Sequence, residues 1–364
     1  MHRNLVALLL ALLLALLFAL ACRAKPVSAP IELVGDASPS SSALPAPPLS
    51  IVVEPDGSGV AEPLLFALAS ATVAVHVEMY LLTNDTYVRA LETAYSNGID
   101  VEVVLNQTFP GGTSSDNTNE SSYATLSAAG VPVTWAPTDT GFDSYTHEKA
   151  VIIDPGTANA QVWIMTMNLD YAGPTSNREY LAKDTDPDDV NEAETIFAAD
   201  FAGESVTPSG ALVVAPSPAN DAVASIVSLI ASATTSIDLE AEELDSAGLA
   251  GQVVGALTTA SANGVAVRVV LEDSSSEEQA SAVRGLVAAG ASVVGYAYGD
   301  GLDIHAKAIV VDTARAYVGS ENITGGSLGY NRELGVIFSD PASVSAVDNA
   351  ILDDFEAGSS YEAD

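Results

Sequence analysis

Cysteine, basic residues and aromatic residues are all scarce in this chain of 364 residues. A single cysteine, Cys22, excludes an intramolecular disulfide framework and any metal site built from several thiolates. The 12 basic residues against 48 acidic ones give a formal net charge of -36, which argues against nucleic acid as a partner because phosphate contacts need a basic surface. Apolar residues still make up 48% of the chain, so its acidity does not indicate disorder.

The N-terminal segment has the pattern of an export signal. A short basic start precedes an apolar run that ends at Ala21, and Cys22 follows directly. We predict a signal peptide over residues 1–21 and a flexible linker rich in Ala, Pro and Ser over 22–48. The position of Cys22 resembles the bacterial lipoprotein cleavage box, in which the thiol is lipidated; a cleaved soluble form and an uncleaved anchor are the alternatives. We therefore expect secretion across a bacterial inner membrane into the cell envelope, as a membrane-anchored lipoprotein or in a periplasmic or extracellular form.

Two segments of the chain carry the same spaced motif. The sequence contains only four histidines and four lysines, and two of each lie in matching His-x-Lys-x4-Asp segments. The first segment has His147, Lys149 and Asp154, and the second has His305, Lys307 and Asp312. A coincidence of this kind is improbable in a chain so poor in both residue types, so the duplication itself indicates function.

The sequence around the two motifs repeats as well. Residues 90–106 (ALETAYSNGIDVEVVLN) match residues 256–272 (ALTTASANGVAVRVVLE), and LSAAG before the first motif matches LVAAG before the second. Internal repeats of this length indicate one structural unit used twice. We place the two copies at residues 49–206 and 207–364.

Each copy alternates short apolar, strand-like segments with amphipathic helical ones. This order predicts an α/β fold with two similar, mostly parallel sheets flanked by helices. We expect the copies to be related by a pseudo-twofold axis, as in a dimer fused into one chain, and the protein to be a monomer. The two motifs would then meet where the copies face each other.

The motif residues suit an anion with several oxygens. In a strand, residues i and i+2 face the same way, so each His-x-Lys presents an imidazole and an ammonium group together. An amide and a hydroxyl follow each motif, from Asn168 and Thr166 in the first copy and from Asn322 and Ser320 in the second. Cations and neutral donors of this kind stabilise an oxyanion, and two imidazoles can attack phosphorus and transfer a proton.

The doubled motif resembles that of the phospholipase D superfamily, which is His-x-Lys-x4-Asp followed by Gly-Ser-x-Asn, present twice. The second copy has the full pattern, with Gly319, Ser320 and Asn322 after His-x-Lys-x4-Asp. In the first copy Met165 and Thr166 replace Gly-Ser, and the threonine keeps the hydroxyl. The resemblance extends over about residues 50 to 360.

The resemblance implies a two-step displacement at a phosphodiester without metal or cofactor. One histidine forms a covalent phosphohistidine while the other protonates the leaving alcohol. We expect His147 to be the nucleophile and His305 the general acid, although the symmetry of the sequence gives no physical reason for this order. Glu179 and Glu333 match the family's acid that orients the catalytic imidazole. Lys149, Lys307, Asn168 and Asn322 complete the expected catalytic set.

Further residues have expected supporting roles. Thr166 and Ser320 are expected to bind substrate, and Asp154 and Asp312 to fix the loop after each motif strand. Arg178 and Arg332, which precede the two glutamates, are expected to form salt bridges. Glu78 and Glu240 lie at equivalent strand ends and are candidates to line the site.

The expected activity is that of a phosphodiesterase that hydrolyses or transfers phospholipid head groups. Its partners would be a phospholipid or another phosphodiester, and the membrane through the N-terminal anchor. Two alternatives stay open: an endonuclease of the same superfamily, which the acidic composition disfavours, and a catalytically silent phosphate-binding module. The intact His, Lys and Asn sets disfavour the second alternative.

Overall fold

The computed structural model describes residues 48–107, 109, 118–137, 145–216 and 221–361. The predicted signal peptide, Cys22 and nearly all of the predicted linker lie outside the described residues, so their roles stay predictions. Within the described ranges, no helix combines the length and the apolar character that crossing a bilayer requires.

The first sheet is built from the N-terminal half of the described chain. Its strands follow the spatial order β1-β7-β6-β5-β2-β3-β4, and the short β12 adds to β7. The bounds of the seven main strands are β1 Leu49–Glu54, β2 Ala74–Met79, β3 Asp100–Leu105, β4 Val133–Trp135, β5 Lys149–Ile153, β6 Gln161–Met165 and β7 Asn177–Asp184. The accompanying helices are α2 Glu62–Ala69, α3 Asp85–Ser96, α4 Glu120–Ala129 and α5 Pro187–Ala202.

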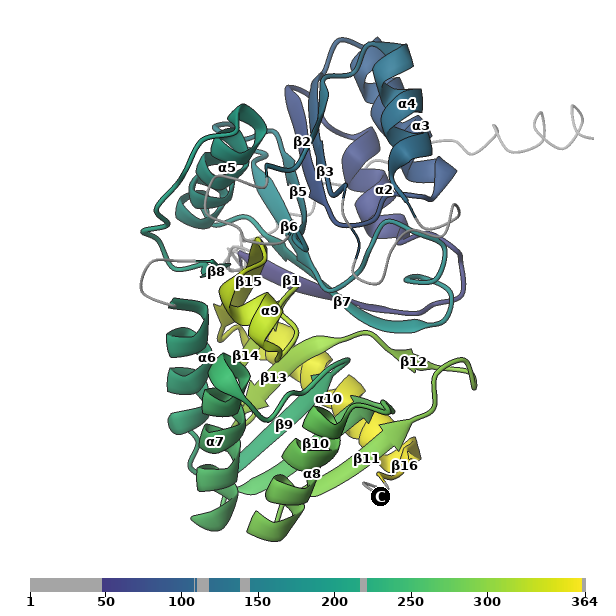
Figure 1. The fold of residues 1–364 in the computed structure, drawn as a ribbon. Coiled ribbons are helices and arrows are strands. Elements are labelled where there is room, and N and C mark those ends of the chain that lie inside the picture. Colours follow the sequence, from purple (N-terminus) through teal and green to yellow (C-terminus); the bar gives the residue numbers. More distant parts are fainter. Residues whose placement is uncertain (1–47, 108, 110–117, 138–144, 217–220, 362–364) are drawn as a thin grey trace, which may run out of the picture. The chain divides into compact units, whose positions relative to one another are not determined.

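The second sheet repeats this order. Its path β8-β15-β14-β13-β9-β10-β11 matches that of the first sheet strand for strand, with β16 added at the far edge. Its strands are β8 Val213–Ala215, β9 Ser236–Ala241, β10 Ala266–Glu272, β11 Ser292–Tyr296, β13 Lys307–Val311, β14 Arg315–Gly319, β15 Glu333–Phe338 and β16 Ser359–Ser360, and β12 is Asp303–Ile304. Its helices are α6 Asp221–Ala231, α7 Gly248–Ala262, α8 Glu277–Ala289, α9 Gly325–Gly329 and α10 Pro341–Ala357. The predicted α/β fold with two similar, helix-flanked sheets is confirmed (Figure 1).

The sheets are mixed, whereas the sequence analysis predicted mostly parallel ones. In the first sheet β2, β3 and β4 pair in parallel, but β2-β5, β5-β6, β6-β7 and β7-β1 are antiparallel. The second sheet has the same division, with β9, β10 and β11 as its parallel part. The short connection between β5 and β6 makes that pair antiparallel, whereas the helical crossovers through α3 and α4 allow β2, β3 and β4 to run parallel.

Equivalent helices of the two copies begin and end at the same types of residue. The glycines of LSAAG and LVAAG, Gly130 and Gly290, follow α4 and α8 in the left-handed conformation, with φ of 87° and 105°. Glycine adopts this conformation at helix ends at little cost because it has no Cβ. Asp186 and Asp340 cap α5 and α10 through their side chains, with proline as the next residue in both helices. The duplication therefore extends to the local chemistry of the helix ends.

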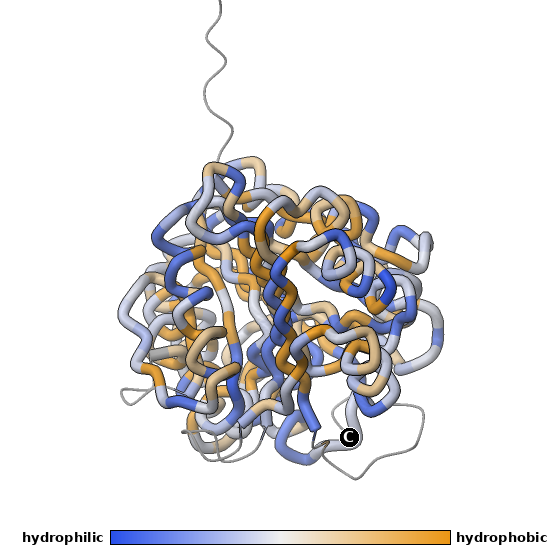
Figure 2. Tube along the Cα trace, turned by 90° about the horizontal axis from the view of Figure 1, so that it is seen from above, coloured by the Kyte–Doolittle hydropathy of each residue, from blue (hydrophilic) through white to orange (hydrophobic). Residues whose placement is uncertain are grey.

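Three apolar cores hold the sheets and helices together. One core packs β2, β3 and β5 against α2 and α3, and a second packs the equivalent strands β9, β10 and β13 against α6, α7 and α8. The third is shared by the two copies, since Ile152, Ile164 and Tyr180 lie in the same cluster as Val310 and Leu334, with α5 and α10 contributing. Figure 2 shows hydrophobic segments running through this interior. The two sheets therefore face each other across a common core.

Candidate active site

His147 lies just before β5 and His305 just before β13, in the middle of each sheet. Backbone hydrogen bonds join the segment that carries each histidine to the other copy. The amide of His147 donates to the carbonyl of Arg332 (2.8 Å), next to the start of β15. In the second copy, Asp303 and Ile304 of β12, just before His305, pair with Asn177 and Arg178 at the start of β7. Each imidazole is therefore carried by a segment that is hydrogen-bonded to the opposite copy.

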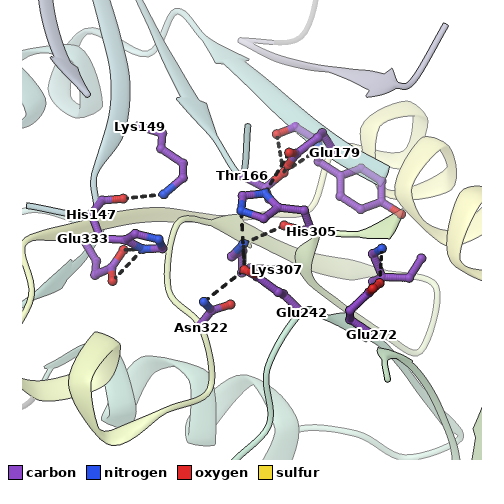
Figure 3. A network of polar contacts seen from close by, with 12 residues as sticks. His147, Lys149, Thr166, Glu179, Glu242, Glu272, His305, Lys307, Asn322 and Glu333 are labelled. Carbon is purple, nitrogen blue, oxygen red and sulfur yellow. Dashed lines mark hydrogen bonds and ion pairs between the residues drawn. The ribbon is translucent and has the colours of Figure 1, made fainter. Parts of the chain in front are cut away.

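Each histidine contacts the glutamate of the other copy. With its proton on Nδ1, His147 donates to both carboxylate oxygens of Glu333, each at 3.0 Å. His305 Nδ1 lies 2.8 Å from Oε1 of Glu179. Both glutamates are fully buried, so they fix the orientation of the rings and leave each Nε2 directed away from the acid (Figure 3). The site is incomplete in either copy alone.

Electrostatics also join the two halves. Burial lowers the pKa of His147 to about 4; the carboxylate of Glu333 opposes this, and the ammonium groups of Lys149 and Lys307 add to it. Burial likewise lowers the pKa of Lys149 to about 7, and the nearby charge of Lys307 contributes. Because one lysine from the second copy affects both groups of the first, the two motifs share one site.

The lysines and asparagines provide donors in this shared site. Lys149 and Lys307 each donate to the carbonyl of the histidine two residues earlier, at 2.7 Å in both copies. Asn168 follows β6, Asn322 follows β14, and both are nearly buried. The Nδ2 group of Asn322 donates to the carboxylate of Glu242 at 3.1 Å. Cations and amides from both copies can thus surround one small anion.

The two hydroxyls that were expected to bind substrate lie behind the glutamates. Thr166 is fully buried and its Oγ1 donates to Glu179, while the amide of Tyr180 donates to Thr166. Ser320 is equally buried, and its hydrogen bond helps to lower the pKa of Glu333, against the effect of burial. The two hydroxyls therefore form hydrogen bonds with the glutamates that orient the histidines. A direct contact between the hydroxyls and substrate stays a prediction.

The aspartates that end the two motifs organise turns. Asp154 has a φ of 52° and its carboxylate accepts hydrogen bonds from the amides of Thr72, Val73 and Ala74. Asp312 has a φ of 53° and accepts from the corresponding amides of residues 234–236. These hydrogen bonds tie the end of each motif strand to the start of its neighbour, which agrees with the predicted structural role.

The two arginines form the predicted salt bridges, which cross between the copies. Arg178 contacts Asp354 of α10 through two nitrogens, and Arg332 contacts Asp200 of α5 in the same way, at 2.7 and 3.1 Å. Glu240 contacts the hydroxyl of Tyr180. The prediction of structural salt bridges is therefore confirmed.

A group of three buried carboxylates lies beside Arg332. One oxygen each of Glu78, Glu148 and Asp200 fall within 4.8 Å of one another, so this group could hold a metal ion. Burial raises the pKa of Glu148 to about 8, and it also raises the pKa values of the other two. With a pKa of about 8, Glu148 holds a proton at neutral pH, which reduces the negative charge of the group. Glu78 is therefore a buried residue of this cluster, and its hydrogen bond to Thr146 places it next to the motif strand.

Two features of the site were not predicted from the sequence. The first is the crossed pairing of histidines and glutamates. The second is Glu242, whose Oε2 lies 2.7 Å from Nζ of Lys307 and 3.5 Å from Nε2 of His305. The sequence contains one indication of this role, because Glu242 directly follows β9 as Tyr80 directly follows β2. A single glutamate in a strongly acidic chain is not distinctive enough to identify from sequence.

Comparison with known proteins agrees with this geometry. A family model described as "Cardiolipin synthase, PLD-like domain" matches residues 64–201 and 226–354, which contain both motifs and most of both sheets. No curated protein has a significantly similar sequence.

Solved structures with this fold include two enzymes of lipid and phosphate metabolism. Polyphosphate kinase from Porphyromonas gingivalis superposes with a TM-score of 0.62 at 15% identity. The match covers 85% of this chain and 46% of the kinase chain. Phosphatidylserine synthase from Haemophilus influenzae Rd KW20 superposes with a TM-score of 0.61 at 12% identity, over 86% of this chain and 87% of that one. At these identities the similarity establishes the fold alone.

Proposed function

The chain belongs to the family of phospholipase D-like domains, whose members act on phosphodiesters, and from this premise we propose that it hydrolyses phospholipid head groups through a phosphohistidine intermediate. The observation that carries the proposal is the crossed pairing of His147 with Glu333 and of His305 with Glu179 around the two motif lysines. Two oriented imidazoles beside two ammonium groups and two amides fit a phosphodiester undergoing displacement.

In the first step, Nε2 of His147 bonds to phosphorus as the bond from phosphorus to the leaving alcohol breaks. The lowered pKa of His147, about 4, leaves this ring neutral at neutral pH, as a nucleophile must be. His305 gives its proton to the departing oxygen. Lys149, Lys307 and the two asparagines neutralise the charge on the non-bridging oxygens.

In the second step, water attacks phosphorus and gives a proton to His305. The bond between phosphorus and His147 breaks, so the ring returns to its neutral state and a phosphatidic acid is released. An alcohol in place of water would give transfer instead of hydrolysis. The net charge of -36 supports a lipid over a nucleic acid as substrate. The N-terminal pattern supports a place at the cell envelope, within reach of membrane lipids.

The proposal is tested by incubating the full-length protein with phospholipid vesicles and with plasmid DNA. We expect release of the free head group, with nicked DNA at or below background. Nicking of DNA without head-group release would instead favour the endonuclease. A protein that binds phosphate but turns over neither substrate would favour the phosphate-binding module.

A further inference from the structure

Tyr80 and Glu242 occupy equivalent places in the two copies. Each follows the strand that pairs with the motif strand, and the motif lysine lies opposite the last strand residue, with Lys149 opposite Met79 and Lys307 opposite Ala241. The amides of Tyr80 and Glu242 donate to the carbonyls of Glu148 and Ala306 respectively, both at 3.0 Å. The first copy therefore has an aromatic ring where the second has a carboxylate.

The Glu242 carboxylate lies where donors of the second copy converge. Its Oε2 accepts hydrogen bonds from Lys307 (2.7 Å) and Asn322 (3.1 Å) and lies 3.5 Å from Nε2 of His305 (Figure 3). These are the groups that a non-bridging oxygen of a phosphodiester would need in the proposed reaction. Glu242 thus takes the position of a phosphate oxygen.

Glu242 is ionised and accessible. Burial alone would raise its pKa, but the charges of His305 and Lys307 and the hydrogen bond from Lys307 lower the pKa well below its usual range. Its side chain is 29% exposed, whereas that of Lys307 is 1% exposed. A ligand can therefore displace the carboxylate from the ammonium group, while the ammonium group stays in place.

Displacement of Glu242 by a phosphate has an electrostatic consequence. The carboxylate loses its ammonium and amide partners yet stays beside the bound anion, and two negative charges in a partly desolvated site repel each other. A substrate lowers this repulsion if it brings a positive charge near the phosphorus. The leaving alcohol is the part of the substrate that lies closest to His305, and hence to Glu242.

The aromatic rings near the site lie beside the nucleophile. The ring of Tyr80 lies 5.7 Å from that of Tyr145 and 4.6 Å from that of His147, and the ammonium group of Lys149 already lies 5.0 Å from the Tyr80 ring. Aromatic faces attract substituted ammonium groups as well as lysine. Because an in-line displacement puts the leaving alcohol opposite His147, these rings lie away from its charge, and the selection rests on Glu242.

We propose that Glu242 is a specificity-determining residue that selects phosphodiesters whose leaving alcohol carries a positive charge, such as a substituted ammonium. This inference rests on the proposed function and specifies the substrate class of the same site. The shared chemistry is an amino-alcohol phosphodiester, which can come from a phospholipid or from a soluble glycerophosphodiester.

The kinetic test compares choline and glycerol leaving groups. It measures kcat/KM of the full-length protein for vesicles of phosphatidylcholine and phosphatidylglycerol, and for glycerophosphocholine and glycerophosphoglycerol. We expect the wild type to prefer the choline compounds, and Glu242→Gln to reduce the choline-to-glycerol ratio at least about tenfold. Glu242→Asp, which keeps the charge, should retain part of the preference. Turnover of vesicles alone identifies the lipid as the source, and turnover of the soluble diesters identifies a free phosphodiester; both agree with the proposal.

A matched control separates the local charge from the overall one. Glu62 is exposed on α2, and Glu62→Gln removes the same charge from the molecule without touching the site, so its ratio should equal that of the wild type. An unchanged ratio in Glu242→Gln, or a wild type that prefers glycerol, overturns the proposal.

A binding measurement does not depend on turnover. Calorimetry compares phosphocholine with glycerol 3-phosphate, which carry the same phosphate. A preference for phosphocholine that Glu242→Gln reduces and Glu62→Gln leaves unchanged supports the role of Glu242, and equal binding of the two ligands by the wild type overturns it. If no phosphodiester is hydrolysed, the proposed function fails on the kinetic result, while calorimetry still decides whether the site selects a cation.

Discussion

The two copies of the motif make the same backbone contacts, but their side chains have different electrostatic environments. Lys149 is buried against the ring of Tyr80, and burial lowers its pKa to about 7. Lys307 makes the same bond to its own histidine and in addition an ion pair with Glu242. One residue at the end of an adjacent strand thus changes the charge balance of an otherwise duplicated site.

The same difference distinguishes the histidines. His147 faces one carboxylate, at Nδ1, and two aromatic rings. His305 lies between two carboxylates, Glu179 at Nδ1 and Glu242 at Nε2. The lowered pKa of His147 and the second carboxylate beside His305 support our proposal that His147 is the nucleophile and His305 the acid.

The largest loss of activity should come from removing either histidine. The two variants should fail at different steps of the reaction. His147→Ala is expected to lower kcat on phospholipid by at least about 10³-fold and to abolish covalent labelling. With bis(p-nitrophenyl) phosphate, whose leaving group needs no proton, His305→Ala should still release a burst of about one p-nitrophenol per protein. Rapid-mixing absorbance measures the burst. A burst in His147→Ala and none in His305→Ala would reverse the assignment.

The crossed pairing predicts that a variant of either glutamate has the same kinetic phenotype as a variant of the histidine in the other copy. Removing a group that orients a catalytic imidazole costs about 10²- to 10⁴-fold in comparable sites. Glu333→Gln should therefore lose labelling like His147→Ala, and Glu179→Gln should keep the p-nitrophenol burst like His305→Ala. The same burst measurement applies. If the phenotypes are exchanged, each histidine is paired with the glutamate of its own copy.

The two arginines give a comparison in stability. The Arg332 side chain is 3% exposed and its partner Asp200 is fully buried, whereas Arg178 is 16% exposed. Arg332→Met leaves a buried carboxylate without its cation and should lower the free energy of unfolding by about 3–5 kcal/mol. Arg178→Met should cost less because water reaches that pair. Urea unfolding of both variants checks this, and equal losses would contradict it.

The smallest effect expected is on the pH profile. His147 must be neutral to attack, and its pKa of about 4 places the acid limb of kcat/KM near that pH. Because this pKa is below that of the unfolded chain, about 6.5, the unfolded state binds the proton first and stability falls as pH drops from about 6.5 toward 4. Loss of the Lys149 cation above pH of about 7 should raise KM. An acid limb near 6.5 would argue against His147 as nucleophile.

Local sequence signals were sufficient to predict the α/β fold and the salt-bridging arginines. The strands after the two motif histidines were predicted too, but they begin at Lys149 and Lys307, so the histidines themselves precede them. The prediction of mostly parallel sheets was wrong because the alternation of strands and helices accounts only for the parallel part of each sheet, while β5 and β6 pair antiparallel through a short connection. The pairing of His147 with Glu333 could not be predicted, since a duplicated sequence is equally compatible with pairing inside one copy. Glu242 could not be recognised among 48 acidic residues before the strand ends of both copies were aligned in space.

The backbone hydrogen bonds that join β12 to β7 and His147 to Arg332 connect the two copies at the very segments that carry the histidines. The halves cannot slide apart without separating both imidazole–carboxylate pairs. Enzymatic turnover should accordingly disappear on heating before helical ellipticity does, and a fragment containing a single copy would retain its imidazole but lack the acid that aligns it.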